Sequence, residues 1–233
     1  MDIQRAAELL AARSAKDFGN ALKDRGDPFK VFYKSLPICI LDAVFSIGVR
    51  YTSVVNVVNS YMATFDLTIS RTQTDETEHT IRDFLTNVAK YDTVEDFSKN
   101  VLHNMQRTSS RNGILKAEAC REVALVCQKH GINTLRDFND YADKTTLDKD
   151  IKSVRGQRSG IMLKYLYMLT GDENRVKPDR HIVRFIKETC TLQKLTDDDA
   201  QAIMVRTVEM LKPEYPNITV RFLDSLIWGT QRR

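Results

Sequence analysis

The stretch that decides the fold runs from residue 151 to residue 186 and reads IKSVRGQRSGIMLKYLYMLTGDENRVKPDRHIVRFI. Its apolar residues recur with a helical period and predict two helices, the second from Ser159 to Leu169. The turn Arg155-Gly156-Gln157-Arg158 separates these helices. After a charged loop, Pro178 and Asp179 are typical of the start of a third helix. The segment therefore predicts three helices joined by a tight hairpin and a loop.

Positive charge is concentrated in the same part of the chain. Between residues 151 and 190 there are nine lysines and arginines and four acids, a net charge of +5, whereas the whole chain of 233 residues carries +4. A surface that binds phosphates needs such a local excess of positive charge. The charge alone fits nucleic-acid binding and a solvent-exposed helix face equally well.

The rest of the chain has the same helical pattern and shows no internal repeat. The β-branched run Val54–Val58 permits a strand, but its neighbours favour a helix. Thr74 and Thr77 are expected caps of a helix that reaches Ala89. Together these patterns predict an all-α protein. Further helices are expected at residues 3–22, 36–47, 53–65, 94–101, 115–129, 134–141, 147–154, 196–211 and 216–228.

Composition indicates a globular protein of one large or two small domains. Hydrophobic residues make up 42% of the chain and charged residues 28%. No apolar run is long enough to cross a membrane, and the N-terminal residues lack the apolar core of a secretion signal, so we expect a cytoplasmic or nucleoid-associated protein. The scattered cysteines predict reduced, mostly buried thiols rather than a zinc or iron–sulfur site. They are Cys39, Cys120, Cys127 and Cys190.

The order of elements in residues 151–186 resembles the helix-hairpin-helix superfamily of base-excision DNA glycosylases, that of endonuclease III and alkyladenine glycosylase. Members carry a hairpin close to L-P-G-V-G, then a helix, a short loop and V-D-x-H-I-x-R. Val154–Arg158 stands in for the hairpin, and the second element is matched by Val176, Asp179, His181, Ile182 and Arg184. Similarity extends over about Leu36 to Trp228, through Leu41-Asp42-Ala43-Val44-Phe45-Ser46 and Lys116-Ala117-Glu118.

The resemblance implies two helical lobes with a cleft between them, acting as a monomer on double-stranded DNA. Residues 36–154 would form one lobe, and residues 1–35 together with 155–233 the other. It also makes Asp179 the catalytic carboxylate, which would stabilise positive charge on the anomeric carbon and orient water. The competing interpretation is that Asp179 only caps a helix, and that His181, two residues later, is structural.

The resemblance further assigns residues that would contact DNA. A glycine in the hairpin lets the backbone approach a phosphate closely. The DNA-binding set is Arg155, Gly156, Arg158, Gly160, Lys164 and Asn112. Asn112 falls near the position that fills the gap left by an extruded base, although it fits a simple turn before Gly113 equally well. Base-stacking candidates, which also fit an ordinary core, are Tyr51, Phe45, Tyr165 and Trp228.

The subtype follows from position 160. Members that also cleave the strand carry a lysine there as amine nucleophile, and Gly160 has no amine, so we expect a monofunctional glycosylase. No cofactor is expected beyond a monovalent ion at the hairpin, where Arg158 replaces the family's second glycine. Two alternatives stay open: a non-catalytic DNA-binding protein, and a glycosylase with lyase activity through a non-standard lysine such as Lys164. The glycine is also expected to leave space for a bulky base, whose identity the sequence does not give.

Overall fold

The computed structural model describes residues 1–23, 33, 35–67 and 78–231. Over these ranges the chain forms twelve α-helices and no strand, with an isolated β-bridge between Arg107 and Leu115, so the predicted all-α fold is confirmed. The helices group into two compact units. Unit 1 comprises Met1–Lys30 and Gly171–Arg233, and unit 2 comprises Val31–Thr170. Each unit has its own apolar core.

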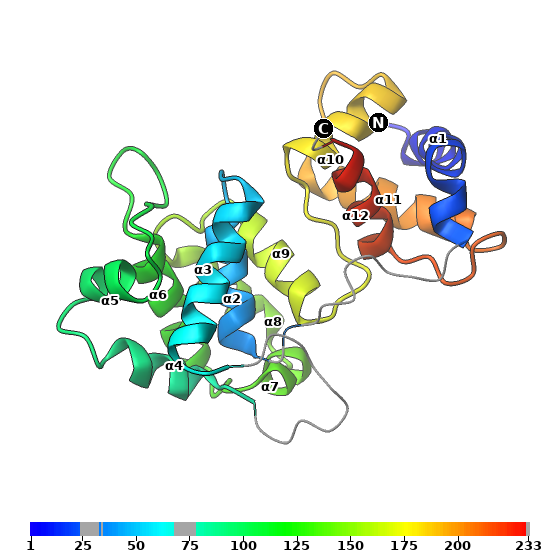
Figure 1. The fold of residues 1–233 in the computed structure, drawn as a ribbon. Coiled ribbons are helices and arrows are strands. Elements are labelled where there is room, and N and C mark those ends of the chain that lie inside the picture. Colours follow the sequence, from blue (N-terminus) through cyan, green and yellow to red (C-terminus); the bar gives the residue numbers. More distant parts are fainter. Residues whose placement is uncertain (24–32, 34, 68–77, 232–233) are drawn as a thin grey trace. The chain divides into compact units, whose positions relative to one another are not determined.

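Unit 1 is built from the two ends of the chain. Its longest pairing joins α1 (Ile3–Lys23) to α11 (Asp197–Leu211), while α10 (Arg180–Cys190) packs against both α1 and α12 (Val220–Gln231) (Figure 1). The buried residues of α1 recur every three or four positions, which gives the helix one apolar face. They are Ala6, Ala7, Leu10, Ala11, Ser14, Phe18 and Leu22.

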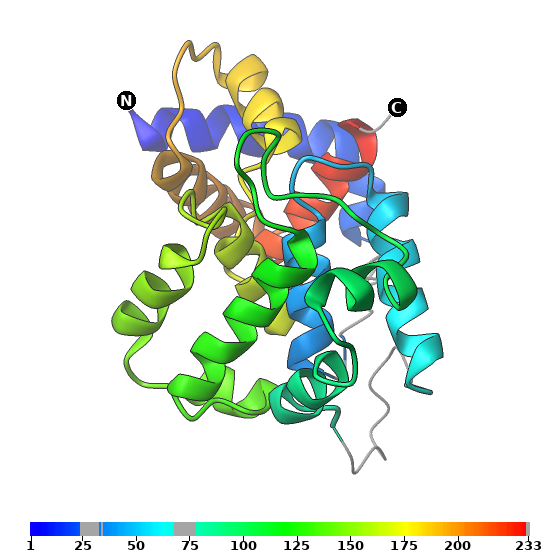
Figure 2. The ribbon, with the colours of Figure 1, turned by 90° about the vertical axis from the view of Figure 1, so that its left-hand side faces the viewer.

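Unit 2 is arranged around α2 (Leu36–Phe45), whose ten residues are all buried. Ser35 caps this helix by accepting the Ile38 N–H, and a proline in the first turn lacks only an N–H that has no helical partner. The helices packed against α2 are α3 (Tyr51–Thr64), α4 (Ile81–Val88), α6 (Lys116–Lys129) and α9 (Ile161–Thr170). Figure 2 shows α6 crossing beside α2. The outer helices are α5 (Val94–Asn100), α7 (Leu135–Asp140) and α8 (Lys144–Ser153).

Several boundaries differ from those expected. The expected caps Thr74 and Thr77 lie outside the described residues, and Thr80 caps α4 in a reciprocal capping box with Asp83. The last helix begins at Val220 rather than near residue 216, because residues 215–218 form a turn closed by the Ile218 N–H and the Tyr215 carbonyl at 3.0 Å. The run Val54–Val58 is helical, as favoured. Helix α9 belongs to unit 2 rather than to the second lobe, because it packs on α2, α7 and α8.

All four cysteines are free thiols, as expected, and three of them are buried. Burial raises the pKa of the Cys127 thiol to about 12 and also raises that of Cys120. Both groups are therefore neutral near pH 7 and act as small apolar side chains. Among the helices that the structure describes, none has the length and apolar character needed to cross a membrane.

Candidate functional site

The hairpin after α8 is closed by two glycines in the left-handed region. Gly156 has a φ of 89° and Gly160 a φ of 74°, a conformation that costs other residues strain. Arg158 is exposed and is not among the residues with positive φ, so the arginine in place of the family's second glycine does not strain the backbone. The hairpin lies in unit 2, whereas Asp179 belongs to unit 1.

The missing side chain of Gly156 makes room for a loop of the protein itself. A Cβ atom at position 156 would lie 2.3 Å from the Cβ and 2.5 Å from the Oγ1 of Thr108. Such distances are shorter than any van der Waals contact allows. The close approach of Thr108 therefore explains by itself why this position is a glycine. The expected close approach of DNA is not needed to account for it.

The same loop carries Asn112, the candidate gap-filling residue. Asn112 is exposed with a φ of 55°, and its carbonyl oxygen accepts a hydrogen bond of 2.7 Å from Arg155 Nη2. The Thr108 N–H donates to the Ile114 carbonyl at 2.9 Å, which closes the base of the loop. The structure thus brings Asn112, Arg155 and Gly156 together, and the Arg155 guanidinium already has a partner within the protein.

A basic groove of about 760 Å³ lies beside the hairpin. The charged residues that line it are Asp148, Lys149, Lys152, Arg155 and Arg158. Its single acid, Asp148, accepts a hydrogen bond of 2.6 Å from the Tyr167 hydroxyl, so four cations outnumber one engaged carboxylate. Such an excess suits a phosphate backbone. Lys164 is half-buried on α9 and is not among the residues of the groove.

The space beside Gly160 is occupied in this structure by the end of the Lys152 side chain. The glycine is buried, and a Cβ atom there would lie 3.0 Å from Lys152 Cε and 3.8 Å from Lys152 Nζ. The side chain of Lys152 therefore covers the position where family members with lyase activity would carry their lysine. The expectation that the glycine makes room for a bulky base stays a prediction, because the nearest atoms belong to the end of a flexible lysine side chain.

Two of the four base-stacking candidates meet at a buried acid. The Asp42 side chain, 0% exposed on α2, accepts hydrogen bonds from the hydroxyls of Tyr33 at 2.6 Å and Tyr51 at 3.4 Å. Tyr165 also bonds to Asp42, and burial followed by the Asp42 charge raises its pKa well above the ordinary value. The three tyrosines are therefore neutral donors around one acid, a cluster that the sequence analysis did not foresee.

The other two candidates lie elsewhere. Phe45 is 1% exposed in the core of unit 2, with Lys116 Nζ 5.8 Å from its ring centroid and bonded to its carbonyl oxygen at 2.9 Å. No face of this ring is open to a base, so the stacking role expected for Phe45 is wrong. Trp228 belongs to unit 1, where it lines a groove of about 880 Å³ with residues of α1 and with Tyr215.

Asp179 is the N-cap of α10. Its Oδ1 accepts the N–H of His181 at 2.8 Å and of Ile182 at 3.2 Å, and its own N–H donates to the Lys177 carbonyl at 2.6 Å. The side chain is half-buried. The capping role is therefore real, and it also fixes the direction of the carboxylate. His181 Nε2 accepts from Arg180 Nε at 3.3 Å, and its buried Nδ1 has no hydrogen-bond partner in the described part of the chain.

A second carboxyl group near Asp179 was missed by the sequence analysis. Asp224 on α12 is only 7% exposed, and its Oδ1 accepts the Lys177 N–H at 3.2 Å. Burial raises the pKa of Asp224 well above its usual range, and the negative charge of Asp179 raises it further. One available signal was a charged residue between the buried positions Leu223 and Ile227 of an amphipathic helix.

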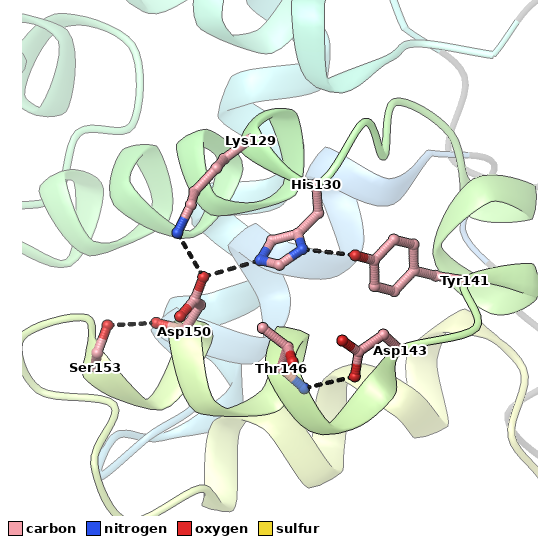
Figure 3. Close-up of polar contacts among 7 residues, drawn as sticks. All are labelled: Lys129, His130, Tyr141, Asp143, Thr146, Asp150 and Ser153. Carbon is pink, nitrogen blue, oxygen red and sulfur yellow. Dashed lines mark hydrogen bonds and ion pairs between the residues drawn. The ribbon is translucent and has the colours of Figure 1, made fainter.

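A polar chain joins α6 to α8, the helix that leads into the hairpin (Figure 3). His130 Nδ1 lies 2.7 Å from the Tyr141 hydroxyl, and its Nε2 lies 2.9 Å from Asp150 Oδ2, which also contacts Lys129 Nζ at 2.8 Å. The hydrogen bonds from Lys129 and His130 lower the pKa of Asp150. This chain was not among the sequence-based predictions, and its direct effect is to hold α8 in place beside α6.

A family model described as a domain of unknown function (DUF8548) matches residues 10–232. The chain belongs to the DUF8548 family. The DUF8548 match takes in both units, and with them the hairpin, the basic groove, Asp179 and Asp224. No curated protein and no solved structure matches the chain.

Proposed function

We propose that this DUF8548 protein is a monofunctional DNA glycosylase, which hydrolyses the N-glycosidic bond of a damaged, mismatched or modified base in double-stranded DNA. The observation that carries the proposal is the place of Asp179 along the chain. It caps α10, directly after the helix–hairpin–helix formed by α8 and α9 with its adjoining basic groove. This is the order of elements in the base-excision glycosylases that the sequence resembles.

The chemistry requires one well-oriented carboxylate. When the bond to the base breaks, the bonding electrons leave with the base and positive charge develops on the anomeric carbon. Asp179 Oδ1 takes both helix N–H bonds, and no hydrogen bond to Oδ2 is present among the described residues, so Oδ2 is the oxygen available to stabilise that charge. The same oxygen can accept the proton of the water that attacks the carbon.

Unit 2 supplies the binding charge. Lys149, Lys152 and Arg158 are exposed and line one groove, as phosphate contacts that position a duplex without reading its sequence would require. Because Gly160 carries no amine, hydrolysis is proposed rather than strand cleavage. A non-catalytic DNA-binding function is the second candidate, favoured by the groove itself, since its charge needs no chemistry at Asp179.

The decisive experiment is a panel of duplexes, each with one altered base, incubated with the protein and then treated with alkali. Strand breaks are expected only after alkali. In Asp179→Asn they should fall by about 10²–10³-fold, the typical cost of losing one electrostatic stabiliser. Asparagine caps helices as well as aspartate does, so this variant removes the charge and keeps α10.

Asp143→Asn is the matched control. Asp143 caps α8, where its Oδ1 accepts the Thr146 N–H at 3.0 Å, so the control makes the same exchange at another cap. Its activity should equal that of the wild type. Duplex binding without release of any base would favour the non-catalytic alternative. A covalent adduct trapped by borohydride on abasic DNA would favour a lyase that uses Lys152 or Lys164.

A further inference from the structure

Asp224 is a buried acid for which the proposed hydrolysis has no use. Only 7% of it is exposed, and it belongs to α12, which packs against α10. An ionised carboxylate in such a place is costly unless it is strongly paired. A buried acid next to a candidate catalytic carboxylate can influence the charge and the position of that carboxylate.

Helix α12 holds the segment that leads to Asp179 at two points. The Arg221 N–H donates to the Glu173 carbonyl at 3.0 Å, and Asp224 Oδ1 accepts the Lys177 N–H at 3.2 Å. The Lys177 carbonyl in turn accepts the Asp179 N–H at 2.6 Å. A single peptide unit therefore separates the atom that Asp224 holds from the cap that aims the Asp179 carboxylate.

Helix α11 holds the same segment from another side. Gln201 Oε1 accepts the Val176 N–H at 3.1 Å, and Gln201 Nε2 donates to the Asn174 carbonyl at 2.7 Å. Two of these anchors, Gln201 and Asp224, are side chains, and only Asp224 is titratable. The position of Asp179 is thus linked to the protonation state of Asp224.

Burial is the main reason why Asp224 favours its neutral form. After burial, the largest single influence is the negative charge of Asp179, which raises the pKa of Asp224, while the hydrogen bond from the Lys177 N–H and the charges of Lys177 and Arg221 each lower it. Two carboxyl groups of which one acts on the other through its charge do not ionise independently. The more accessible group is Asp179 and the more buried one is Asp224, so the proton resides on Asp224.

We propose that Asp179 and Asp224 form a carboxyl pair that holds one proton at neutral pH, with Asp224 as its protonated member and the positioning residue for Asp179. The carboxyl pair is proposed for the protein without DNA. Only its role in catalysis rests on the proposed glycosylase function. During hydrolysis Asp224 keeps its proton. The attacking water gives its proton to Asp179, and the departing base takes one from solvent.

The direct test is carbonyl-carbon NMR of the full chain labelled with ¹³C at the aspartate side-chain carboxyls, titrated without DNA. One resonance should still report a protonated carboxyl at pH 7. It should be absent in Asp224→Asn, which is isosteric with the neutral acid and keeps an oxygen for the Lys177 N–H. Absence of any protonated aspartate at pH 7 in the wild type would overturn the proposal.

Coupling within the pair is tested by Asp179→Asn. Removing the Asp179 charge should move the titration midpoint of that same resonance to lower pH, whereas Asp143→Asn should leave it unchanged. An unmoved midpoint would refute the pair. This measurement does not depend on Asp224→Asn, so the proposal stays testable if that variant fails to fold.

A pH profile then separates the pair from the proposed function. With a cleaved duplex in hand, the wild-type kcat/KM should fall on the alkaline side as Asp224 ionises and a second negative charge repels the Asp179 carboxylate. In Asp224→Asn that alkaline limb should be missing, and superimposable profiles would count against a positioning role. If no duplex is cleaved but the NMR titrations behave as expected, the glycosylase proposal fails and the pair stands.

Discussion

The two candidate regions handle charge in opposite ways. In unit 1, Asp179 and Asp224 are half-buried or buried and are held by backbone N–H groups. In unit 2, Lys149, Lys152 and Arg158 are exposed around an open groove. Buried charges take their protonation state from the protein and affect its stability, whereas exposed charges respond mainly to salt. The carboxyl groups of unit 1 are therefore sensitive to pH, and the exposed cations of unit 2 to salt.

The largest expected effect tests whether the hairpin glycine serves the fold. Gly156→Ala should lower the free energy of unfolding by about 3 kcal/mol, because it adds left-handed strain to an overlap with Thr108. Gly131→Ala is the matched control, since its φ is 72° with nothing within 4 Å of the new Cβ, and it should cost only about 1 kcal/mol. Urea titrations followed by circular dichroism measure both values.

The single tryptophan refines this comparison, because Trp228 lies in unit 1. Its fluorescence reports the unfolding of that unit, while circular dichroism reports both. If Gly156→Ala and Gly131→Ala turn out equally stable, the contact with Thr108 contributes nothing, and DNA becomes the better explanation of the glycine.

The next effect is a pH dependence confined to the buried acid. The folded pKa of Asp224 is raised, so its stabilising contribution is complete below the unfolded pKa of about 4 and is lost as pH rises toward the folded pKa. Over that window the free energy of unfolding should fall by at most about 1.4 kcal/mol per pH unit relative to Asp224→Asn. Trp228 fluorescence in urea at several pH values measures the difference. Parallel curves for the two proteins would mean that Asp224 is ionised throughout.

The smallest effect concerns the groove. Replacing Lys149, Lys152 or Arg158 by alanine should each reduce the slope of log affinity against log salt by about 1. The slope is obtained by measuring the affinity for an undamaged duplex by fluorescence anisotropy at salt concentrations from low to moderate. Lys16→Ala, on the groove of unit 1, serves as control and should leave it unchanged. Equal slopes for all four variants would contradict the prediction that DNA binds in the basic groove.

Most of the fold could be predicted from local patterns. Helix starts such as Thr134 and Thr196 carry their own capping chemistry, each with an aspartate three residues later that closes a capping box. The position of Asp179 at a helix start could also be predicted, because a proline followed by an acid, as at Pro178 and Asp179, is a local signal of a helix N-terminus. Such signals depend only on neighbours along the chain, so they can be recognised without knowledge of the tertiary structure.

The rest depends on contacts between distant residues. Nothing near Gly156 in sequence indicates that Thr108 occupies the space of its absent side chain. Phe45 looked like an aromatic available for stacking, but packing around α2 buries it. Asp42 and Asp224 are weakly indicated by the sequence, as acids among the apolar residues of a helix. Their partners Tyr33, Tyr165 and Lys177 are brought to them only by the tertiary structure.

The way unit 1 is assembled has a consequence for biosynthesis. Helix α1 finds its main partner only in α11, and 173 residues separate Lys23 from Asp197. At typical translation speeds of roughly 5–20 residues per second, the ribosome needs on the order of 10–35 s to bridge that interval. The other partner of α1, helix α10, begins only at Arg180, so the apolar face of α1 is unpaired for most of this time, while unit 2 can already form its own core. Unit 1, which contains Asp179, therefore completes its core later than unit 2.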